Sequence, residues 1–166
     1  MQTRKLLLKL FEYKGWANAD LYTLMHSLKS DLHARELHDA IRILNHIYVV
    51  DQIFVANLQG KRHGYTSLNT KETPALRDLQ LGVQVVDEWY VAYVAAQTEI
   101  GFAEDIDFTF VDGKPGRMSR GEMLLHVATH GNYHRGAVGR ILFQAGIQPP
   151  KDTLTVFMGQ QAAYLP

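Results

Sequence analysis

The chain has 166 residues, of which 46% are apolar and 20% charged, an ordinary composition that fits one globular domain over residues 1–166. Its 17 basic residues are balanced by 17 acidic ones, so it lacks the basic excess that displaces counterions from phosphate, and we expect no nucleic-acid partner. The absence of cysteine excludes disulfides and thiolate nucleophiles and agrees with a cytoplasmic location, and no apolar run is long enough to span a membrane.

Four segments carry apolar residues at intervals of three and four, the period of an amphipathic helix. The stripe of the first segment consists of Leu6, Leu10, Tyr13, Ala17, Leu21, Leu24 and Leu28. The second segment runs from about Leu37 to Leu58, and Gly60 follows it as a stop signal. Its stripe consists of Ile43, Ile47, Val50, Phe54 and Leu58.

The third and fourth segments have recognisable ends. The third opens at Thr73-Pro74, which is read as an N-cap followed by proline at the first helical position, and Gly101 ends it. The fourth opens at Ser119, which with Glu122 has the spacing of a capping box, and Gly146 ends it. The two stripes consist of Leu76, Leu79, Val83, Val86, Tyr90 and Tyr93, and of Leu124, Val127, Gly131, His134, Val138, Ile141 and Ala145.

Residues 102–118 predict a small β-hairpin between the last two helices. Ile106, Phe108 and Phe110 alternate with polar residues, and Asp112-Gly113 supplies a tight turn. The tail beyond Pro150 predicts a short C-terminal helix. Since four amphipathic helices can bury their stripes by packing side by side, we predict an all-α fold, a four-helix bundle with these two additions.

The histidines are the most informative polar residues. Of the eight, His26, His33, His38 and His63 lie near helix ends or in polar loops, where we expect them to face solvent. His130 and His134 are four residues apart on the fourth helix, so their side chains share one face, as in HExxH zinc motifs. Because inward-facing imidazoles must satisfy their ring nitrogens, a shared metal ion is a good partner for this pair.

A catalytic type of metal site needs a third ligand, and His46 is the candidate because it lies at the edge of the apolar stripe of the second helix. The competitor is His126, one turn before His130. At 1.5 Å per residue it lies about 12 Å along the axis from His134, too far to share an ion easily, so we interpret it as packing against or supporting the ligands. Gly131 indicates close approach of another helix or a ligand. The competing interpretation is that these histidines are ordinary core residues.

Three motifs resemble those of the DinB/YfiT-like superfamily of bacterial damage- and stress-associated proteins. They are Tyr13-Lys14-Gly15-Trp16-Ala17-Asn18, Leu44-Asn45-His46-Ile47 followed by Asp51, and Leu125-His126-Val127 followed by His130-Gly131-Asn132-Tyr133-His134-Arg135-Gly136. The resemblance implies a four-helix bundle, often dimeric, whose metal ligands map onto His46, His130 and His134. Tyr133 and Ala137 depart from the residues that many members carry at the edge of the pocket.

The resemblance implies a metal site but leaves the reaction open. Some members of the family and relatives of the fold are thiol-dependent transferases or isomerases. Three neutral imidazoles leave a divalent ion, zinc or nickel, with its full charge and open positions. Such an ion would activate a low-molecular-weight thiol or water against a small-molecule substrate. Two hypotheses therefore remain. The protein is either a metal-dependent enzyme, an S-transferase or a hydrolase, or a non-catalytic metal-binding stress-response protein.

The remaining expectations concern residues around the site and the oligomeric state. Glu12, Tyr13 and Trp16 either reach the pocket or serve ordinary packing and surface roles. Asp51 is predicted to pair with an arginine, and Arg135 to be structural or interfacial. We expect a homodimer, since the resemblance implies one and the tail carries aromatics that are predicted to be exposed, such as Phe157 and Tyr164.

Overall fold

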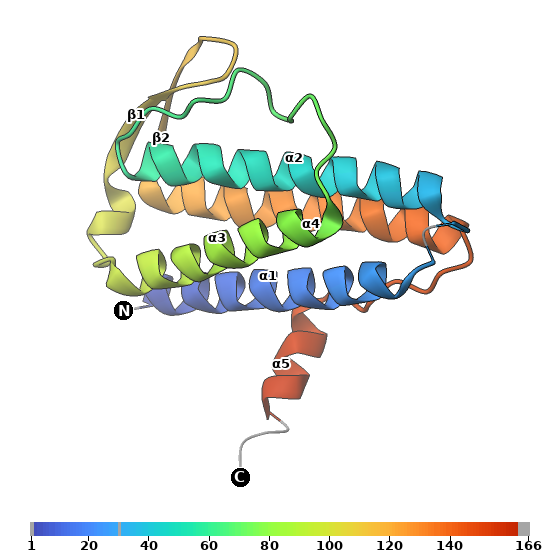
Figure 1. Cartoon of the computed structure of the whole chain (residues 1–166). Coiled ribbons are helices and arrows are strands. Elements are labelled where there is room, and N and C mark those ends of the chain that lie inside the picture. The colour runs from blue at the N-terminus through green and yellow to red at the C-terminus, as the bar shows by residue number, and fades with distance from the viewer. Residues whose placement is uncertain (1, 30, 163–166) are drawn as a thin grey trace.

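The computed structural model describes residues 2–29 and 31–162 and confirms the predicted four-helix bundle (Figure 1). The bundle helices are α1 (Gln2–Ser27), α2 (Ala34–Leu58), α3 (Leu76–Ala96) and α4 (Arg120–Gln144). A 3-10 turn, η1 (Gly101–Ala103), and a hairpin of β1 (Asp105–Thr109) and β2 (Pro115–Ser119) connect α3 to α4, and α5 (Leu154–Ala162) closes the chain. In the described part of the chain, no helix combines the length and apolar character needed to cross a membrane.

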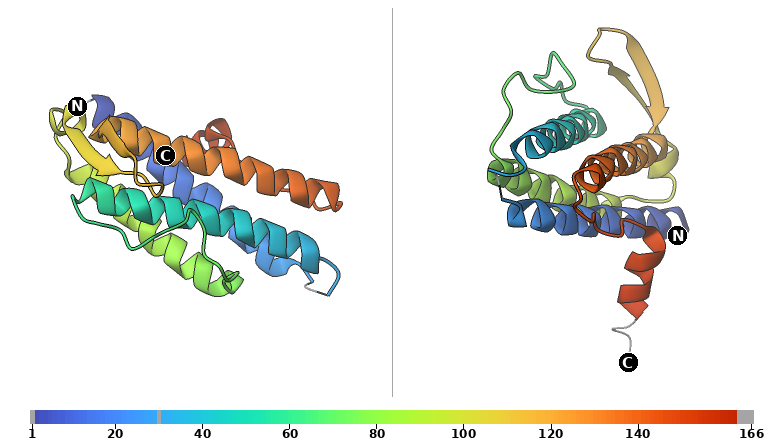
Figure 2. Two further views of the ribbon diagram at one scale, coloured as in Figure 1. Left: turned by 90° about the horizontal axis from the view of Figure 1, so that it is seen from above. Right: turned by 90° about the vertical axis from the view of Figure 1, so that its right-hand side faces the viewer.

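The connection between α2 and α3 crosses the outside of the bundle. Both helices start at the same end, so residues 59–75 must travel back along α2 before α3 can begin (Figure 1). The end-on view shows this connection and the hairpin rising on the same side, over α2 and α4 (Figure 2). The side of the bundle formed by α2 and α4 is therefore flanked by two non-helical arms.

The ends of α3 differ from the prediction, whereas the start of α4 agrees with it. α3 begins at Leu76 with Ala75 as N-cap, two residues after Pro74. Thr73 is not the N-cap, because its hydroxyl contacts His38 instead. The helix stops at Ala96 rather than Gly101, because Gln97 is already extended with ψ of 148°. The capping box of α4 is present as predicted, with Ser119 and Glu122 bonding each other's backbone N–H groups.

The hairpin has the predicted strands and turn. The strands are antiparallel with Ile106 opposite Met118, and Gly113 in the turn has φ of 86°, a value that glycine adopts without strain. Ile106 and Phe108 pack on the end of the core, where the Phe108 ring lies 6.1 Å from that of Phe54. The hairpin is thereby fixed to α2.

The bundle core consists of two apolar clusters with a charged layer between them. One cluster, near the hairpin, contains Phe11, Phe54 and Tyr90, and the other, near the opposite end, contains Leu21, Leu44, Ile47, Val83 and Val138. Between them along their helices lie the buried residues Lys14 of α1, Asp51 of α2 and Asp87 of α3. The core is thus interrupted halfway along the bundle.

Lys14 is the centre of this layer. Its Nζ lies 2.7 Å from Asp51 Oδ2 and 2.5 Å from Asp87 Oδ1, and Asn18 donates to the other oxygen of Asp87 at 2.7 Å. Burial alone would lower the pKa of Lys14, but the two carboxylates outweigh it and raise that pKa. Burial raises the pKa of Asp51 to about 6, although Lys14 opposes the shift. The predicted arginine partner of Asp51 is therefore wrong, since its ion pair is with Lys14.

The charged layer also explains two local features. The apolar stripe of α1 is displaced from the predicted one, with Leu6 65% exposed and Leu7, Phe11 and Lys14 buried in its place. A Cβ atom at Gly131 would lie 3.4 Å from Lys14 Cε and 3.3 Å from Arg135 Nη1. The close approach that Gly131 indicated is thus made by these two long cationic side chains.

The C-terminal segment packs against α1 and α4. Phe157 is only 3% exposed and packs against Tyr13 and Trp16, which overturns its prediction as an exposed aromatic. Arg135 is buried and structural, and its Nε donates to Asp152 Oδ2 at 2.7 Å. Tyr13 also donates to Asp152. Tyr164 lies outside the described residues.

We predict that Lys14→Met destabilises the fold by about 3–5 kcal/mol, because two carboxylates would remain buried without their cation. Urea unfolding followed by circular dichroism measures this change. The matched control is Lys9→Met, which removes a partly exposed pair with Glu12 and should cost no more than about 1 kcal/mol. If both variants lost the same free energy of unfolding, the charged layer would contribute no more to stability than a partly exposed ion pair.

Candidate metal centre

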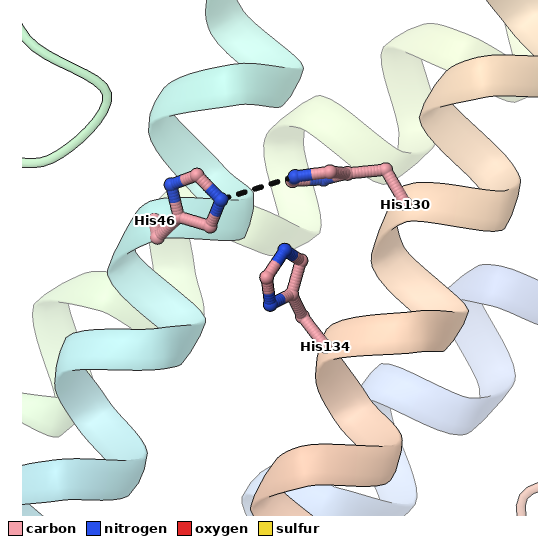
Figure 3. Close-up of side chains that lie close together, drawn as sticks. All are labelled: His46, His130 and His134. Carbon is pink, nitrogen blue, oxygen red and sulfur yellow. Dashed lines mark hydrogen bonds between the residues drawn. The ribbon is translucent and has the colours of Figure 1, made fainter.

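Three histidines from two helices converge between α2 and α4, as the sequence predicted. His46 projects from α2, and His130 and His134 project from consecutive turns of α4 toward it (Figure 3). The ring centroids are 4.9 Å apart for His46 and His130, 4.6 Å for His46 and His134, and 4.5 Å for His130 and His134. One nitrogen of each ring lies within 4.8 Å of one nitrogen of each of the others.

His46 is oriented by the connection that crosses α2. Its Nδ1 lies 2.8 Å from the carbonyl oxygen of Leu68. Because a carbonyl only accepts, this nitrogen carries the proton, which leaves a lone pair on Nε2. That lone pair faces His130, whose Nε2 is 3.0 Å away. The backbone of the connection therefore turns the free nitrogen of His46 toward His130.

Buried amides hold this connection in place. Asn45, which precedes His46, donates to Asn69 Oδ1 at 2.5 Å and to Thr70 Oγ1 at 2.6 Å. Asn69 donates in turn to the carbonyl of Arg42 at 2.9 Å. In the sequence these supports are marked only by Asn45, a polar residue beside His46 that is 2% exposed in the fold.

The electrostatics of the site favour the neutral form of the two imidazoles on α4. Burial lowers the pKa of His130 to about 3, with further lowering from the nearby imidazoles and Lys14. Burial and His46 lower the pKa of His134 as well. His130 Nδ1 is buried with no hydrogen-bond partner among the described residues. Since metal ions bind the neutral imidazole, these ligands need little proton release at physiological pH.

The convergence has the dimensions of a metal site. Two nitrogens bound to one tetrahedral zinc ion are about 3.4 Å apart, given bond lengths of about 2.0–2.1 Å. The separation of 3.0 Å between the Nε2 atoms of His46 and His130 is close to that value. All three side chains are partly exposed. The group could thus hold a metal ion and leave a position open to a small molecule.

His126 lies beside the group rather than within it. Its ring packs 4.8 Å from that of Phe54 and 5.5 Å from that of His130, and burial lowers its pKa. This position agrees with its interpretation as a packing or supporting residue.

Glu12, Tyr13 and Trp16 do not reach the histidines. Glu12 pairs with Lys9 at 2.5 Å, and the rings of Tyr13 and Trp16 pack on Phe157. Of the two roles considered for them, the packing and surface role is the one that the fold assigns.

The other histidines behave differently from one another. His26 and His38 are exposed, as predicted, and His26 contacts Gln80 at 2.9 Å. His33 and His63 are instead half-buried, and His63 Nδ1 has no partner among the described residues. The expectation that these two face solvent therefore holds only in part.

The comparisons with known proteins agree with the fold and with the motifs. The chain is 26% identical over 153 residues to the protein DinB of Bacillus subtilis strain 168, covering 83% of this chain and 85% of the relative. A crystal structure of a DinB-like protein from Bacillus cereus ATCC 10987 superposes with a TM-score of 0.63 at 20% identity, covering 87% of this chain and 93% of the other. The match to the DinB family extends over residues 1–163, and the chain therefore belongs to the DinB family.

Proposed function

We propose that the protein binds one divalent metal ion through His46, His130 and His134, and that it is a metal-dependent enzyme acting on a small-molecule electrophile. The nucleophile would be an external low-molecular-weight thiol, making it an S-transferase, or water, making it a hydrolase. The observation that carries the proposal is the convergence of three partly exposed imidazole rings from α2 and α4.

The chemistry of the donor set supports this proposal. Bound by three neutral imidazoles, a divalent ion would retain its charge and lower the pKa of a water or thiol beside it. Zinc and nickel are the preferred candidates, since imidazole suits both. Because the chain has no cysteine, a thiol nucleophile would have to come from a second molecule.

The residues around the ligands would set the geometry of the reaction. The carbonyl of Leu68 fixes the tautomer of His46, and the pair His130 and His134 is held one helical turn apart on α4. Tyr133, which is 76% exposed, stacks edge-on against His134 with ring centroids 5.0 Å apart. Tyr133 would therefore contact a substrate at the rim of the site.

A metal-binding stress-response protein without turnover is the second candidate. It is favoured by the composition of the ligand group, in which the described residues supply three histidines and no carboxylate that could act as a general base. The two candidates differ in whether a metal-loaded preparation turns over any thiol or hydrolytic substrate.

The proposal includes a homodimer. With Phe157 buried, its support is the outer face of α4, where Leu125, Tyr133 and Phe143 are 51%, 76% and 56% exposed. Light scattering that gives a monomer mass at micromolar concentration would overturn this part of the proposal.

We predict that His130→Ala and His134→Ala each reduce the metal content of the purified protein from one ion per chain to near zero. The helical circular dichroism should persist, because the apolar clusters hold the bundle together. Elemental analysis and calorimetric titration with zinc measure the effect. His38→Ala, which removes an exposed histidine, should keep the full metal content, and equal loss in this control would disprove the assignment of the ligands.

Asn69→Ala should weaken metal binding by roughly 10- to 100-fold while leaving all three ligands in place, since it loosens the support that orients His46. Competition with a chromophoric chelator measures the affinity. Ser67→Ala is the matched control, an exposed position on the same connection. An unchanged affinity in the Asn69 variant would mean that the connection does not position His46.

Removal of the metal with a chelator should abolish any thiol-transfer or hydrolytic activity found on a panel of electrophiles, and zinc or nickel should restore it. A preparation that keeps its full rate after elemental analysis shows no metal would contradict the enzymatic proposal. Complete inactivity of the fully loaded protein on the panel would favour the non-catalytic candidate.

A further inference from the structure

A cavity of about 520 Å³ lies between the end of α2 with the following connection and the hairpin. Residues 57, 60–63 and 65 form one wall and residues 107–111 form the other. The two walls thus belong to the connection and the hairpin, the two arms seen in Figure 2. We call it the hairpin pocket. None of the three converging histidines lines it, and its volume is typical of a small-molecule site.

Two buried polar atoms in its wall have no partner. Asn57 is only 7% exposed, and neither its Nδ2 nor the Nδ1 of His63 has a hydrogen-bond partner among the described residues. A buried donor left unpaired costs about 1–3 kcal/mol. Asn57 can only donate through this nitrogen, so a ligand that satisfies it must present an acceptor.

The charges around the pocket favour an anionic acceptor. Lys61 and Arg62 belong to the wall and are exposed, and no carboxylate in the described part of the chain lies within ion-pair distance of either. The acidic residue of the wall, Asp107, is already 3.7 Å from Arg117 Nη1. The wall thus holds two cations and one carboxylate, and that carboxylate is shared with Arg117, so the pocket keeps an excess of positive charge that suits a carboxylate ligand.

The opposite wall is aromatic. The rings of Phe108 and Phe110 meet edge to face with centroids 4.8 Å apart, and Phe110 remains 49% exposed. Tyr65 adds a third ring from the wall formed by the connection, and its hydroxyl donates to Gln52, which does not line the cavity. Flat apolar groups pack well against such rings.

We propose that the hairpin pocket binds a small aromatic carboxylate. The carboxylate lies toward Lys61 and Arg62 and accepts from the Asn57 amide, while the ring packs on Phe108 and Phe110. This site is independent of metal binding, because its walls share no residue with the histidine group.

The test is calorimetric titration of the full chain with naphthoate, with naphthamide as the uncharged analogue and acetate as the analogue without a ring. Naphthoate should bind saturably at millimolar concentration or below, with both analogues weaker by about tenfold. Binding should also shift the side-chain amide signals of Asn57 in NMR spectra. Absence of saturable naphthoate binding, or equal binding of naphthamide or acetate, would overturn the proposal.

Variants locate the site. Lys61→Gln with Arg62→Gln should weaken naphthoate binding by about tenfold, whereas Lys71→Gln, on the same connection but outside the pocket, should not. Asn57→Leu should weaken binding without lowering the thermal stability, since an unpaired buried amide is replaced by an apolar group of similar size. His130→Ala should leave naphthoate binding unchanged. Loss of binding in that variant would place the ligand at the histidines and overturn the proposal.

Discussion

The buried ammonium group of Lys14 is the constraint on which the rest of the structure depends. A charge in the middle of a bundle must be compensated, and Asp51 and Asp87 approach it from two other helices. α4 can pass close to it because Gly131 has no side chain. Gly131 lies between His130 and His134 on α4, so the same packing that accommodates Lys14 fixes the distance of both histidines from α2. The charged layer and the histidine group therefore lie at the same level along the bundle.

This arrangement links the stability of the bundle to the placement of the three histidines. Two apolar clusters of ordinary character hold the ends of the bundle, and the buried ion pairs of Lys14 with Asp51 and Asp87 lie between them. Replacing a buried ion pair with apolar residues is often neutral or stabilising, so the layer is not the most economical core. Lys14 makes a small contribution to the lowered pKa of His130, so the layer is consistent with a role in keeping that imidazole neutral and correctly placed. The connection over α2 completes the site from outside through the Leu68 carbonyl.

The sequence allowed prediction of the helices, the hairpin and the converging histidines, because each depends on local spacing. Periodicity located α1, α2 and α4, and the interval between His130 and His134 placed both rings on one face. Prediction failed where the determinant was distant in sequence. Lys14 interrupts an apolar face, so hydropathy selected Leu6 rather than Leu7. The partner of Asp51, the path of residues 59–75 and the burial of Phe157 depend on the packing of helices whose directions periodicity does not reveal.

The central claim is that His46, His130 and His134 together bind one divalent ion. Anomalous X-ray diffraction from crystals of the zinc-loaded protein tests it most directly. A single strong anomalous difference peak should lie between α2 and α4, at about 2.0–2.1 Å from one nitrogen of each of the three rings. A peak that lies elsewhere, or an ion bound by His130 and His134 without His46, would contradict the claim.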